Sequence, residues 1–529
     1  RLRRFLVKYK TTSKLIFYST QVNVVLVLVI LLVILSTYIH FNQKRPQSAL
    51  FLLLITGFLL RLFMAAVDPF LQDWDERFHA LVAKNLIHHP LTPMLRLDPI
   101  MAFKIEDWCC NHIWVHKQPL FLWQMALSMK LFGVNEVAMR LPSVIMGTIS
   151  IYFVYDLANR WIKNIDISFV AALLFAVSNY QLELTSGRFP LEQNDVAFAF
   201  YVTASIWAFV RYLQSGRTFK WAIFIGIFVG CAVLNKWLTG ILIYGGWGLY
   251  ELLSNKGKIH FKPWKLFVVS VFTSLLVFVP WQLYIMHYFP AESSVMYKHN
   301  SKHIFEALDG NGGTIWFHFA EMSNLYGKHL LLFILLGAYA ILSDKQVDKK
   351  LSGSLIAMVL VIYSFFSFVV KTKMPAFTFP VNSIIWILIA SGIITSFVRV
   401  SNEQKPYILI LWIVLASIIT LKPWEISDKR SHDNQPRNAK IHNTQIFKKL
   451  DVAGKLKNRV ILNCKSFEDV ELMFYKDVNA YHWFPDESTL DSLMKKGHTF
   501  AAFQSHHNQQ LPDYIQHNPA IKIINEALE

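Results

Sequence analysis

Charged residues are scarce in this chain. Asp, Glu, Lys and Arg together make up 16% of its 529 residues, whereas a typical soluble domain has about 25%. Hydrophobic residues make up 54%. This composition argues against an ordinary soluble domain, and we expect most of the chain to be solvated by lipid.

Cysteine is also scarce. The chain has only Cys109, Cys110, Cys231 and Cys464, and two of these are adjacent, so no disulfide framework can be read from their spacing. The sequence shows no glycine-rich phosphate loop and no internal repeat. It therefore gives no sign of a disulfide-stapled secreted domain or of a P-loop.

Basic residues outnumber acidic ones, and the formal charge is +17. A nucleic-acid-binding protein gathers such residues into one patch. Here Lys and Arg form short clusters between apolar runs, which is typical of cytoplasmic loops in a membrane protein. We therefore expect membrane lipids, and no nucleic acid, as partners.

Apolar runs recur along the chain. A membrane-spanning helix needs about 20 mainly apolar residues, because every backbone polar group must be bonded within the segment. The runs lie near residues 21–40, 49–67, 141–158, 168–184, 196–213, 221–235, 238–253, 265–285, 329–343, 352–370, 377–397 and 406–421. The sequence predicts a polytopic α-helical membrane protein with about 11–12 transmembrane helices.

Basic loops alternate with the others and set the topology. They lie near residues 44, 160, 211–220, 256–265, 345–350 and 399–405. Placing them in the cytoplasm puts two long loops, 68–140 and 286–328, and the chain after 421 outside. The short segments 186–195, 371–375 and the turn at 236 then also lie outside. Two runs fit poorly: 119–133 is expected to be a helix along the outer interface, and whether 21–40 spans is left open.

The composition becomes polar after Trp424. A Lys/Asn/His-rich linker (428–445) precedes strand-like runs at 459–463 and 499–503 and helical patterns at 468–475 and 488–496. Such alternation is typical of a small α/β domain. We therefore expect a basic N-terminal segment with an extra apolar helix (1–48), a transmembrane catalytic domain (49–424) and an extracytoplasmic α/β domain (425–529).

Ionisable groups mark three of the outer segments. Ionisable groups at the mouth of a span are costly to desolvate and are therefore candidates for function. Each one alone is also compatible with a solvated loop, or with a lysine that snorkels to the interface. They are Asp75 and Glu76 beyond the span that ends near 67, His116 and Lys117 at the start of the interfacial helix, and Arg188 and Asp195 around a short loop.

Three lysines lie where the charge rule disfavours them. Lys236 sits between two apolar runs, and Lys371 and Lys373 sit between two others. An anionic ligand would explain this placement, although short loops tolerate one or two such residues. Together with the outer carboxylates, the lysines describe a pocket for a lipid-linked phosphate and a general base.

Histidines in the outer loops raise the option of a divalent metal. His299 and His303 are four residues apart, so they share a face of a helix, and His112 and His116 lie in the first outer loop. Two histidines without an evident third ligand are weak support for a metal site.

The order of these motifs resembles that of bacterial C-type (GT-C) membrane glycosyltransferases. This is the dolichyl-phosphate-mannose-protein mannosyltransferase-like superfamily, which includes the lipid A aminoarabinose transferases (glycosyltransferase family 39/83-like). The run from Lys117 to Ser143 is the most specific part, and the resemblance covers roughly residues 49–400. The other matching parts are Asp75-Glu76-Arg77, Arg188 with Asp195, Asn235-Lys236, and the run from Lys371 to Pro375.

The resemblance implies a GT-C fold and the transfer of a sugar, with inversion, from a polyprenyl-phosphate carrier to an acceptor on the outer face of the membrane. Asp75, with Glu76 beside it, matches the catalytic acidic position, and Asp195 matches a second one. The donor phosphate would then be bound by Lys117, Arg188, Lys236, Lys371 and Lys373. The implied setting is the bacterial inner membrane with a periplasmic active site.

One motif departs from the family. Lipid A transferases tend to carry Glu-Lys-Pro-Pro where this chain has His116-Lys-Gln-Pro, and that Glu can share a metal site with a later histidine, for which His299 is the positional match. His116 and His299 are therefore the candidate metal ligands. The acceptor, whether protein, lipid A-like lipid or surface glycan, is not specified by the motifs.

Two other function classes are compatible with many spans and intramembrane charges. A transporter or lipid flippase is the main alternative, but such proteins usually show paired halves or helices broken at matching positions, and neither is visible here. A catalytically silent scaffold is the other, and the presence of Asp75 argues against it.

Overall fold

The computed structural model describes residues 2–107, 109–188, 192–236, 238–255, 261–400, 406–504 and 511–529, with side chains described from residue 21 onward except at 261–262 and 398–400. Most of the described chain is helical. Parts of two predicted basic loops, 256–260 and 401–405, and residues 189–191 of the predicted outer loop lie outside the described residues.

Long apolar helices dominate the structure, which confirms the polytopic helical architecture. Eight helical segments in the described part are long and apolar enough to cross a membrane, or ten if two bent pairs each count as one span. The eight are Gln21–Phe41, Pro46–Ala66, Glu136–Ile162, Gln193–Gln214, Pro263–Tyr288, Lys349–Val369, Pro375–Phe397 and Pro406–Lys429. The pairs are Ile165–Ala176 with Asn179–Ser186, bent by 41°, and Phe317–Tyr326 with Lys328–Ser343, bent by 100°.

Even the larger number, ten, is below the expected 11–12, because two predicted spans form helices that are too short to be counted. The helix Phe219–Val233 has 15 residues and the helix Leu242–Ser254 has 13, which is less than a bilayer crossing needs. The chain breaks between them at Asn235 and Lys236, and this break carries Lys236 into the site described below.

The elements follow one another along the chain with short connections. The helices are α1 (Leu2–Phe41), α2 (Pro46–Ala66), α3 (Asp75–Leu86), α4 (Pro119–Phe132), α5 (Glu136–Ile162), α6 (Ile165–Ala176), α7 (Asn179–Ser186), α8 (Gln193–Gln214), α9 (Phe219–Val233), η1 (Leu238–Ile241), α10 (Leu242–Ser254), α11 (Phe261–Tyr288), α12 (Pro290–Phe305), α13 (Phe317–Tyr326), η2 (Lys328–Leu330), α14 (Leu331–Ser343), α15 (Lys349–Ser364), η3 (Phe365–Val369), η4 (Pro375–Val381), α16 (Asn382–Val400), α17 (Pro406–Leu421), α18 (Pro423–Lys429), α19 (Gln435–Lys449), α20 (Glu468–Tyr475), α21 (Glu487–Lys495) and α22 (Asp513–Gln516). The strands are β1 (Arg459–Leu462), β2 (Thr499–Phe503) and β3 (Lys522–Ile524).

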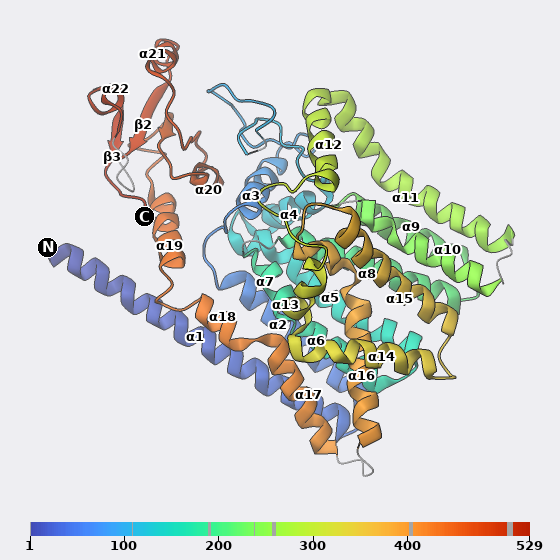
Figure 1. Cartoon of the computed structure of the whole chain (residues 1–529). Helices are drawn as coiled ribbons and strands as arrows, with labels where there is room; N and C mark the ends of the chain where they lie inside the picture. The colour runs from blue at the N-terminus through green and yellow to red at the C-terminus, as the bar shows by residue number, and fades with distance from the viewer. Residues whose placement is uncertain are drawn as a thin grey trace.

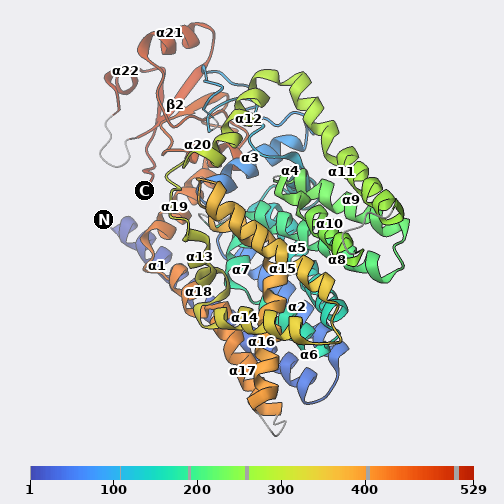
Figure 2. The ribbon, with the colours of Figure 1, turned by 45° about the vertical axis from the view of Figure 1, so that its right-hand side comes forward.

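The helices form one bundle with the C-terminal domain at one end, as Figures 1 and 2 show from two sides. The segment Pro375–Phe397 runs through the interior, and an apolar stretch of 18 residues within it is 94% buried. It packs closely on α14, because a Cβ atom at Gly337 would lie 1.8 Å from the carbonyl oxygen of Leu388. Small residues at such crossings let two helix backbones approach each other in a membrane. The helix α1 packs against α2 and α17, so the extra apolar helix belongs to the bundle.

The C-terminal segment contains the predicted α/β unit. Its three strands form a parallel sheet in the order β1-β2-β3, with Val460 opposite Phe500 and Ala502 opposite Ile523. Both predicted strands and both predicted helices are present, with shifts of a residue or so. The predicted linker is different: it contains α18 and α19, and the side chain of Asn434 caps α19 by accepting a hydrogen bond from the backbone N–H of Arg437.

Buried ion pairs join this C-terminal segment to the first outer loop. Arg96 donates to Asp469 at 2.6 Å, and both side chains are nearly inaccessible to solvent. Arg77 of α3 pairs with Glu471 of α20 at 3.2 Å, and both side chains are also buried. A third pair, Lys448 of α19 with Glu136 of α5 at 2.6 Å, is partly exposed. A buried pair strongly resists removal of one partner, so these contacts fix the outer loop against the C-terminal segment.

Candidate functional site

A polar cavity of about 190 Å³ lies at the end of the bundle that carries the C-terminal domain. It brings together segments that are far apart in the sequence. Its walls are formed by Asp73, Trp74, Asp75, His116, Lys117, Gln118, Glu192, Asn235, Lys236, His299, Asn300, His303, Asp309, Asn311, Met374 and Phe377. Of the predicted site residues, Asp75, His116, Lys117, Lys236 and His299 line it.

Asp75 is the first residue of α3. The residue before it, Trp74, has φ 62° and ψ −126°, a conformation that is costly for a side chain other than glycine. Asp73 is held on the other side of this turn, by Arg77 and by Lys440 of α19, whose ammonium group lies 2.6 Å away. The turn therefore places the Asp75 carboxylate at the cavity wall and is fixed by contacts outside the cavity.

Lys117 lies just before α4. The helix begins at Pro119, whose ring suits the first helical position, and Gln118 before it is extended. The Lys117 ammonium group lies 3.3 Å from an oxygen of Asp75 and 3.3 Å from an oxygen of Glu192. It therefore bridges two carboxylates that come from different loops.

Asp195 and Lys236 form a second pair beside the first. Asp195 is in the first turn of α8 and accepts from the Lys236 ammonium group at 2.5 Å. The Asn235 side chain donates to the backbone oxygen of Asn194 at 2.9 Å, which ties the break after α9 to the start of α8. Glu192 lies 4.0 Å from Lys236 and so links the two pairs.

The charges of this cluster shift the acidity of its members. Removal from bulk water and the neighbouring Glu192 raise the pKa of Asp75 well above its ordinary value, and Lys117 offsets this only in part. Burial acts in the same direction on Glu192, but Lys117 and Lys236 outweigh it and hold the pKa of Glu192 well below its usual range. Of these two carboxyl groups, Asp75 therefore takes up a proton more readily than Glu192.

Glu76 points away from the cavity, although it is adjacent to Asp75. Its carboxylate is buried and accepts from Arg140 of α5 at 2.7 and 2.9 Å. The backbone N–H of Gln72 and the side chain of Gln193 also donate to it. Arg140 additionally donates to the backbone oxygens of Ala65, Asp68 and Phe70. The structure thus places this predicted catalytic residue in a buried contact between α3 and α5.

The other predicted phosphate ligands also lie outside the cavity walls. The Lys373 ammonium group is buried and donates to three backbone oxygens, those of Phe366, Ser367 and Val370, at 2.6 to 2.8 Å. Those carbonyls belong to or follow the η3 turn, which leaves them without regular helical partners. Lys371 is exposed next to the wall, and Arg188 lines a different, neighbouring cavity.

Histidines form one side of the cavity. The rings of His116 and His299 are 5.7 Å apart, and those of His299 and His303 are also 5.7 Å apart. Within the described residues, the one group of three side chains whose ligand atoms lie within 4.8 Å of one another is Asp75, His79 and Glu192. Burial and the neighbouring Lys117 lower the pKa of His79 to about 3, so its imidazole is neutral and able to act as a ligand.

Two residues of this cluster were not predicted from the sequence. Glu192 lies between Arg188 and Asp195 in the motif, but only its neighbours were assigned roles. His79 lies one helical turn after Asp75, and this i, i+4 spacing was the signal that both side chains share a face of α3.

Comparisons with known proteins agree with this fold. Residues 116–284 match the family described as dolichyl-phosphate-mannose-protein mannosyltransferase. A protein of Aquifex aeolicus is 24% identical over 346 residues, which are 64% of this chain and 63% of that protein. The undecaprenyl phosphate-alpha-4-amino-4-deoxy-L-arabinose arabinosyl transferase of Pseudomonas aeruginosa is 28% identical over 149 residues, which are 26% of each chain. The matches thus span less than two thirds of either relative.

Two solved structures share the fold over most of the chain. ArnT from Cupriavidus metallidurans, in the apo state, matches with a TM-score of 0.61 and 14% sequence identity. The match covers 85% of this chain and 92% of ArnT. The Archaeoglobus fulgidus oligosaccharyltransferase, in the apo form, matches with a TM-score of 0.57 and 12% sequence identity. The match covers 86% of this chain and 69% of the oligosaccharyltransferase. The resemblance that the motifs indicate is confirmed: residues 116–284 match the dolichyl-phosphate-mannose-protein mannosyltransferase family, and the fold is shared with ArnT over most of the chain.

Proposed function

We propose that this protein is an inverting glycosyltransferase that moves a sugar from a polyprenyl-phosphate carrier to a hydroxyl or phosphate of a protein, lipid or glycan acceptor. The observation that carries the proposal is the arrangement of Asp75, whose pKa is raised, 3.3 Å from Lys117 in a cavity that also holds Lys236. A carboxylate with a raised pKa suits a general base, and two lysines suit a phosphate.

The proposed reaction assigns a role to each of these residues. The acceptor oxygen attacks the anomeric carbon of the donor sugar, and Asp75 takes the acceptor proton. The new oxygen–carbon bond forms as the bond from that carbon to the phosphate oxygen breaks, and polyprenyl phosphate leaves with the bonding electrons. Lys117 and Lys236 lie where they would stabilise the charge on the departing phosphate, which is the kind of interaction that contributes most to catalysis.

The raised pKa of Asp75 predicts the acid limb of the pH–rate profile. Asp75 must be deprotonated to act as a base, so the rate falls as the pH drops through its pKa, and a raised pKa moves that fall to a higher pH than for an ordinary Asp. We expect kcat/KM for transfer to decline on the acid side well above pH 4. A profile that stays flat down to pH 4 would contradict the assignment of Asp75 as the base.

Lys236 and Lys371 give a matched test of donor binding. Lys236 lines the cavity and contacts Asp195, whereas Lys371 is exposed outside the walls. We expect Lys236→Gln to lower kcat/KM for the donor about 10²- to 10³-fold, by analogy with loss of one charge-stabilising donor, and Lys371→Gln to lower it far less. The measurement is release of polyprenyl phosphate from a labelled donor. A larger loss in Lys371→Gln would reverse the assignment.

We propose a location for a divalent metal as well. Asp75, His79 and Glu192 offer carboxylate and imidazole ligands that suit Mn²⁺ or Zn²⁺, and His116 and His299 adjoin them. An ion held there would add positive charge next to the donor phosphate. Mn²⁺ binding, followed by electron paramagnetic resonance, is expected to weaken at least about tenfold in His79→Ala. Loss of binding in His299→Ala alone would place the ion at His116 and His299 instead.

We also propose that the site faces the periplasm from the bacterial inner membrane. The support is the alternation of basic loops along the sequence, which puts 68–140, 286–328 and the C-terminal segment on the non-cytoplasmic side. In the structure these three segments meet at one end of the bundle (Figure 1). In a variant whose native cysteines are replaced by Ser, cysteines placed at exposed Asp107 and at Lys345 in a basic loop are expected to react with an impermeant maleimide from opposite sides.

A further inference from the structure

A second cavity, of about 180 Å³, lies beside the first and is strongly basic. It is enclosed by the segment after α2, by the end of α7 and by α18 and α19. Five cationic side chains line it: Arg188, Lys429, Arg430, Arg437 and Lys440. The carboxylates on its walls are Asp68 and Asp73.

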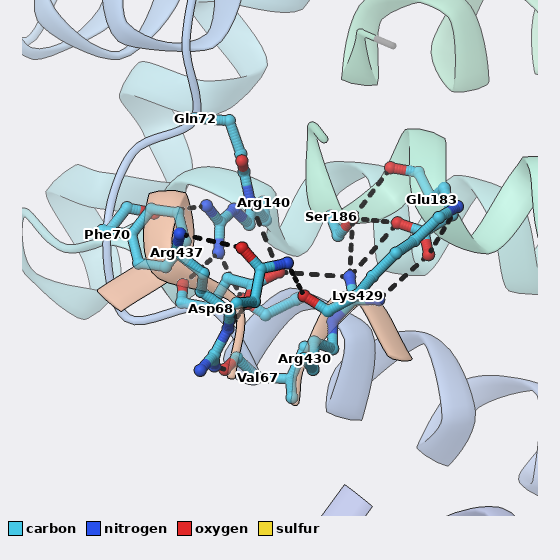
Figure 3. A network of polar contacts seen from close by, with 12 residues as sticks. Val67, Asp68, Phe70, Gln72, Arg140, Glu183, Ser186, Lys429, Arg430 and Arg437 are labelled. Atoms are coloured by element: carbon cyan, nitrogen blue, oxygen red, sulfur yellow. Dashed lines mark hydrogen bonds and ion pairs between the residues drawn. The ribbon is translucent and has the colours of Figure 1, made fainter. Parts of the chain in front are cut away.

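Part of this positive charge is neutralised by a buried network, shown in Figure 3. Arg430 contacts Asp68 at 3.1 Å and Glu183 at 2.9 Å, and Arg437 contacts Asp68 at 2.9 Å. Burial alone would raise the pKa of Asp68, but Arg430, Arg437 and Arg140 outweigh it and lower this pKa, so Asp68 stays ionised. This network holds α18 and α19 against the end of α2.

The remaining positive charge is not neutralised to the same degree. Lys429 lies 3.8 Å from Glu183 and 3.9 Å from Glu425, which are long contacts. The Arg188 guanidinium forms no ion pair or hydrogen bond with another residue that the structure describes, and it is partly exposed to the cavity. The arginine fork and the lysine ammonium are both suited to a phosphate or carboxylate.

The basic cavity adjoins the proposed catalytic cavity. Asp73 lines both, and it is two residues from Asp75. Arg188 lines the basic cavity, and Glu192, four residues later in the sequence, lines the catalytic cavity. A group bound among the cations would therefore lie next to the cavity that holds Asp75.

We propose that this cavity binds an acidic group, a phosphate monoester or a carboxylate, carried by the acceptor close to the atom that receives the sugar. The inference rests on the proposed function, because it assigns Lys117 and Lys236 to the donor and leaves the cations of the adjoining cavity to the acceptor. The acceptor class is then an anionic molecule, and Arg188 and Lys429 select it over a neutral one.

The test compares acidic and neutral probes on the whole chain of residues 1–529 in nanodiscs of neutral lipid. The soluble pair is glucose 6-phosphate and glucose, and the lipid pair is dihexanoyl phosphatidic acid and dihexanoylglycerol. Titration calorimetry is expected to show at least about tenfold tighter binding of one acidic probe than of its neutral partner, and this preference is lost in the double variant Arg188→Gln/Lys429→Gln. The probe that shows the preference tells whether the group is carried by a soluble or a lipid-borne molecule.

Lys449→Gln is the matched control, because this lysine is on α19 but lines a separate cavity. It should keep the preference, and thermal unfolding should show that the double variant is folded. Equal binding of acidic and neutral probes to the unaltered protein, or a preference that survives in the folded double variant, overturns the inference. A labelled polyprenyl-phosphate sugar titrated in parallel separates the two proposals, since failure of that donor to bind would count against the proposed function itself.

Discussion

Asp75→Asn is expected to lower the rate of sugar transfer by about 10²- to 10⁴-fold, the range for loss of a positioned general base. The substitution keeps the size of the side chain and removes the group that would accept the acceptor's proton. It also removes one of the two carboxylates that hold Lys117 in place. The measurement is transfer of label from a polyprenyl-phosphate sugar at saturating donor.

The control for this variant is Asp107→Asn. Asp107 is an exposed carboxylate in the same outer loop and does not line the cavity, so its substitution should leave transfer and thermal stability unchanged. Donor binding in Asp75→Asn should persist, because Lys117 and Lys236 remain. Transfer at the normal rate by folded Asp75→Asn protein would remove this residue from the mechanism.

Glu76→Ala is expected to lower the free energy of unfolding by about 3–5 kcal/mol, the cost of leaving one member of a buried ion pair without its partner. Glu76 and Arg140 are both fully buried and make two hydrogen bonds with each other. Thermal unfolding and the yield of folded protein in detergent measure the effect. The exposed Glu106 provides the control, Glu106→Ala, which should be neutral.

A second variant separates this structural role from a catalytic one. Glu76→Leu combined with Arg140→Met removes both charges, and replacing a whole buried pair by apolar side chains usually restores much of the lost stability. If the role of Glu76 is structural, the double variant should regain much of the lost stability, and transfer with it. A stable double variant that is inactive would instead support the catalytic role predicted for Glu76 from the sequence.

The helical architecture and the C-terminal strands could be predicted because their signals are local. Twenty-residue apolar runs specify spanning helices, and the runs 459–463 and 499–503 have the apolar character of buried strands. The gathering of Asp75, Lys117 and Lys236 could be anticipated because topology placed all three at the same side of the membrane. The resemblance supplied the expectation that they act together.

The division of work between Asp75 and Glu76 could not be predicted. Successive residues on a helix point about 100° apart, so one faces the cavity and the other faces α5, and the sequence does not tell which. The position of Lys373 could not be predicted either. Its ammonium group donates hydrogen bonds to backbone carbonyls of a π-helical turn. That turn leaves no distinctive pattern in the sequence.

The linker predicted at 428–445 was wrong for a related reason. Its Lys, Asn and His residues are typical of a solvated segment, but Arg430 and Arg437 are buried there because Asp68 and Glu183, more than two hundred residues away, receive them. Likewise, the apolar runs on both sides of Lys236 have the composition of spans. The helices that they form, α9 and α10, are short because the chain turns between them, where Lys236 lies. In both cases the local structure depends on ion pairs with residues that are distant in the sequence.

The most direct test of the central claim is transfer of label from a synthetic polyprenyl-phosphate sugar in right-side-out and inverted membrane vesicles that contain the protein, with Asp75→Asn vesicles beside them. The account predicts acceptor labelling when donor and acceptor are supplied on the non-cytoplasmic face, and none with Asp75→Asn. Labelling that requires the cytoplasmic face, or that is unchanged in folded Asp75→Asn protein, would contradict it.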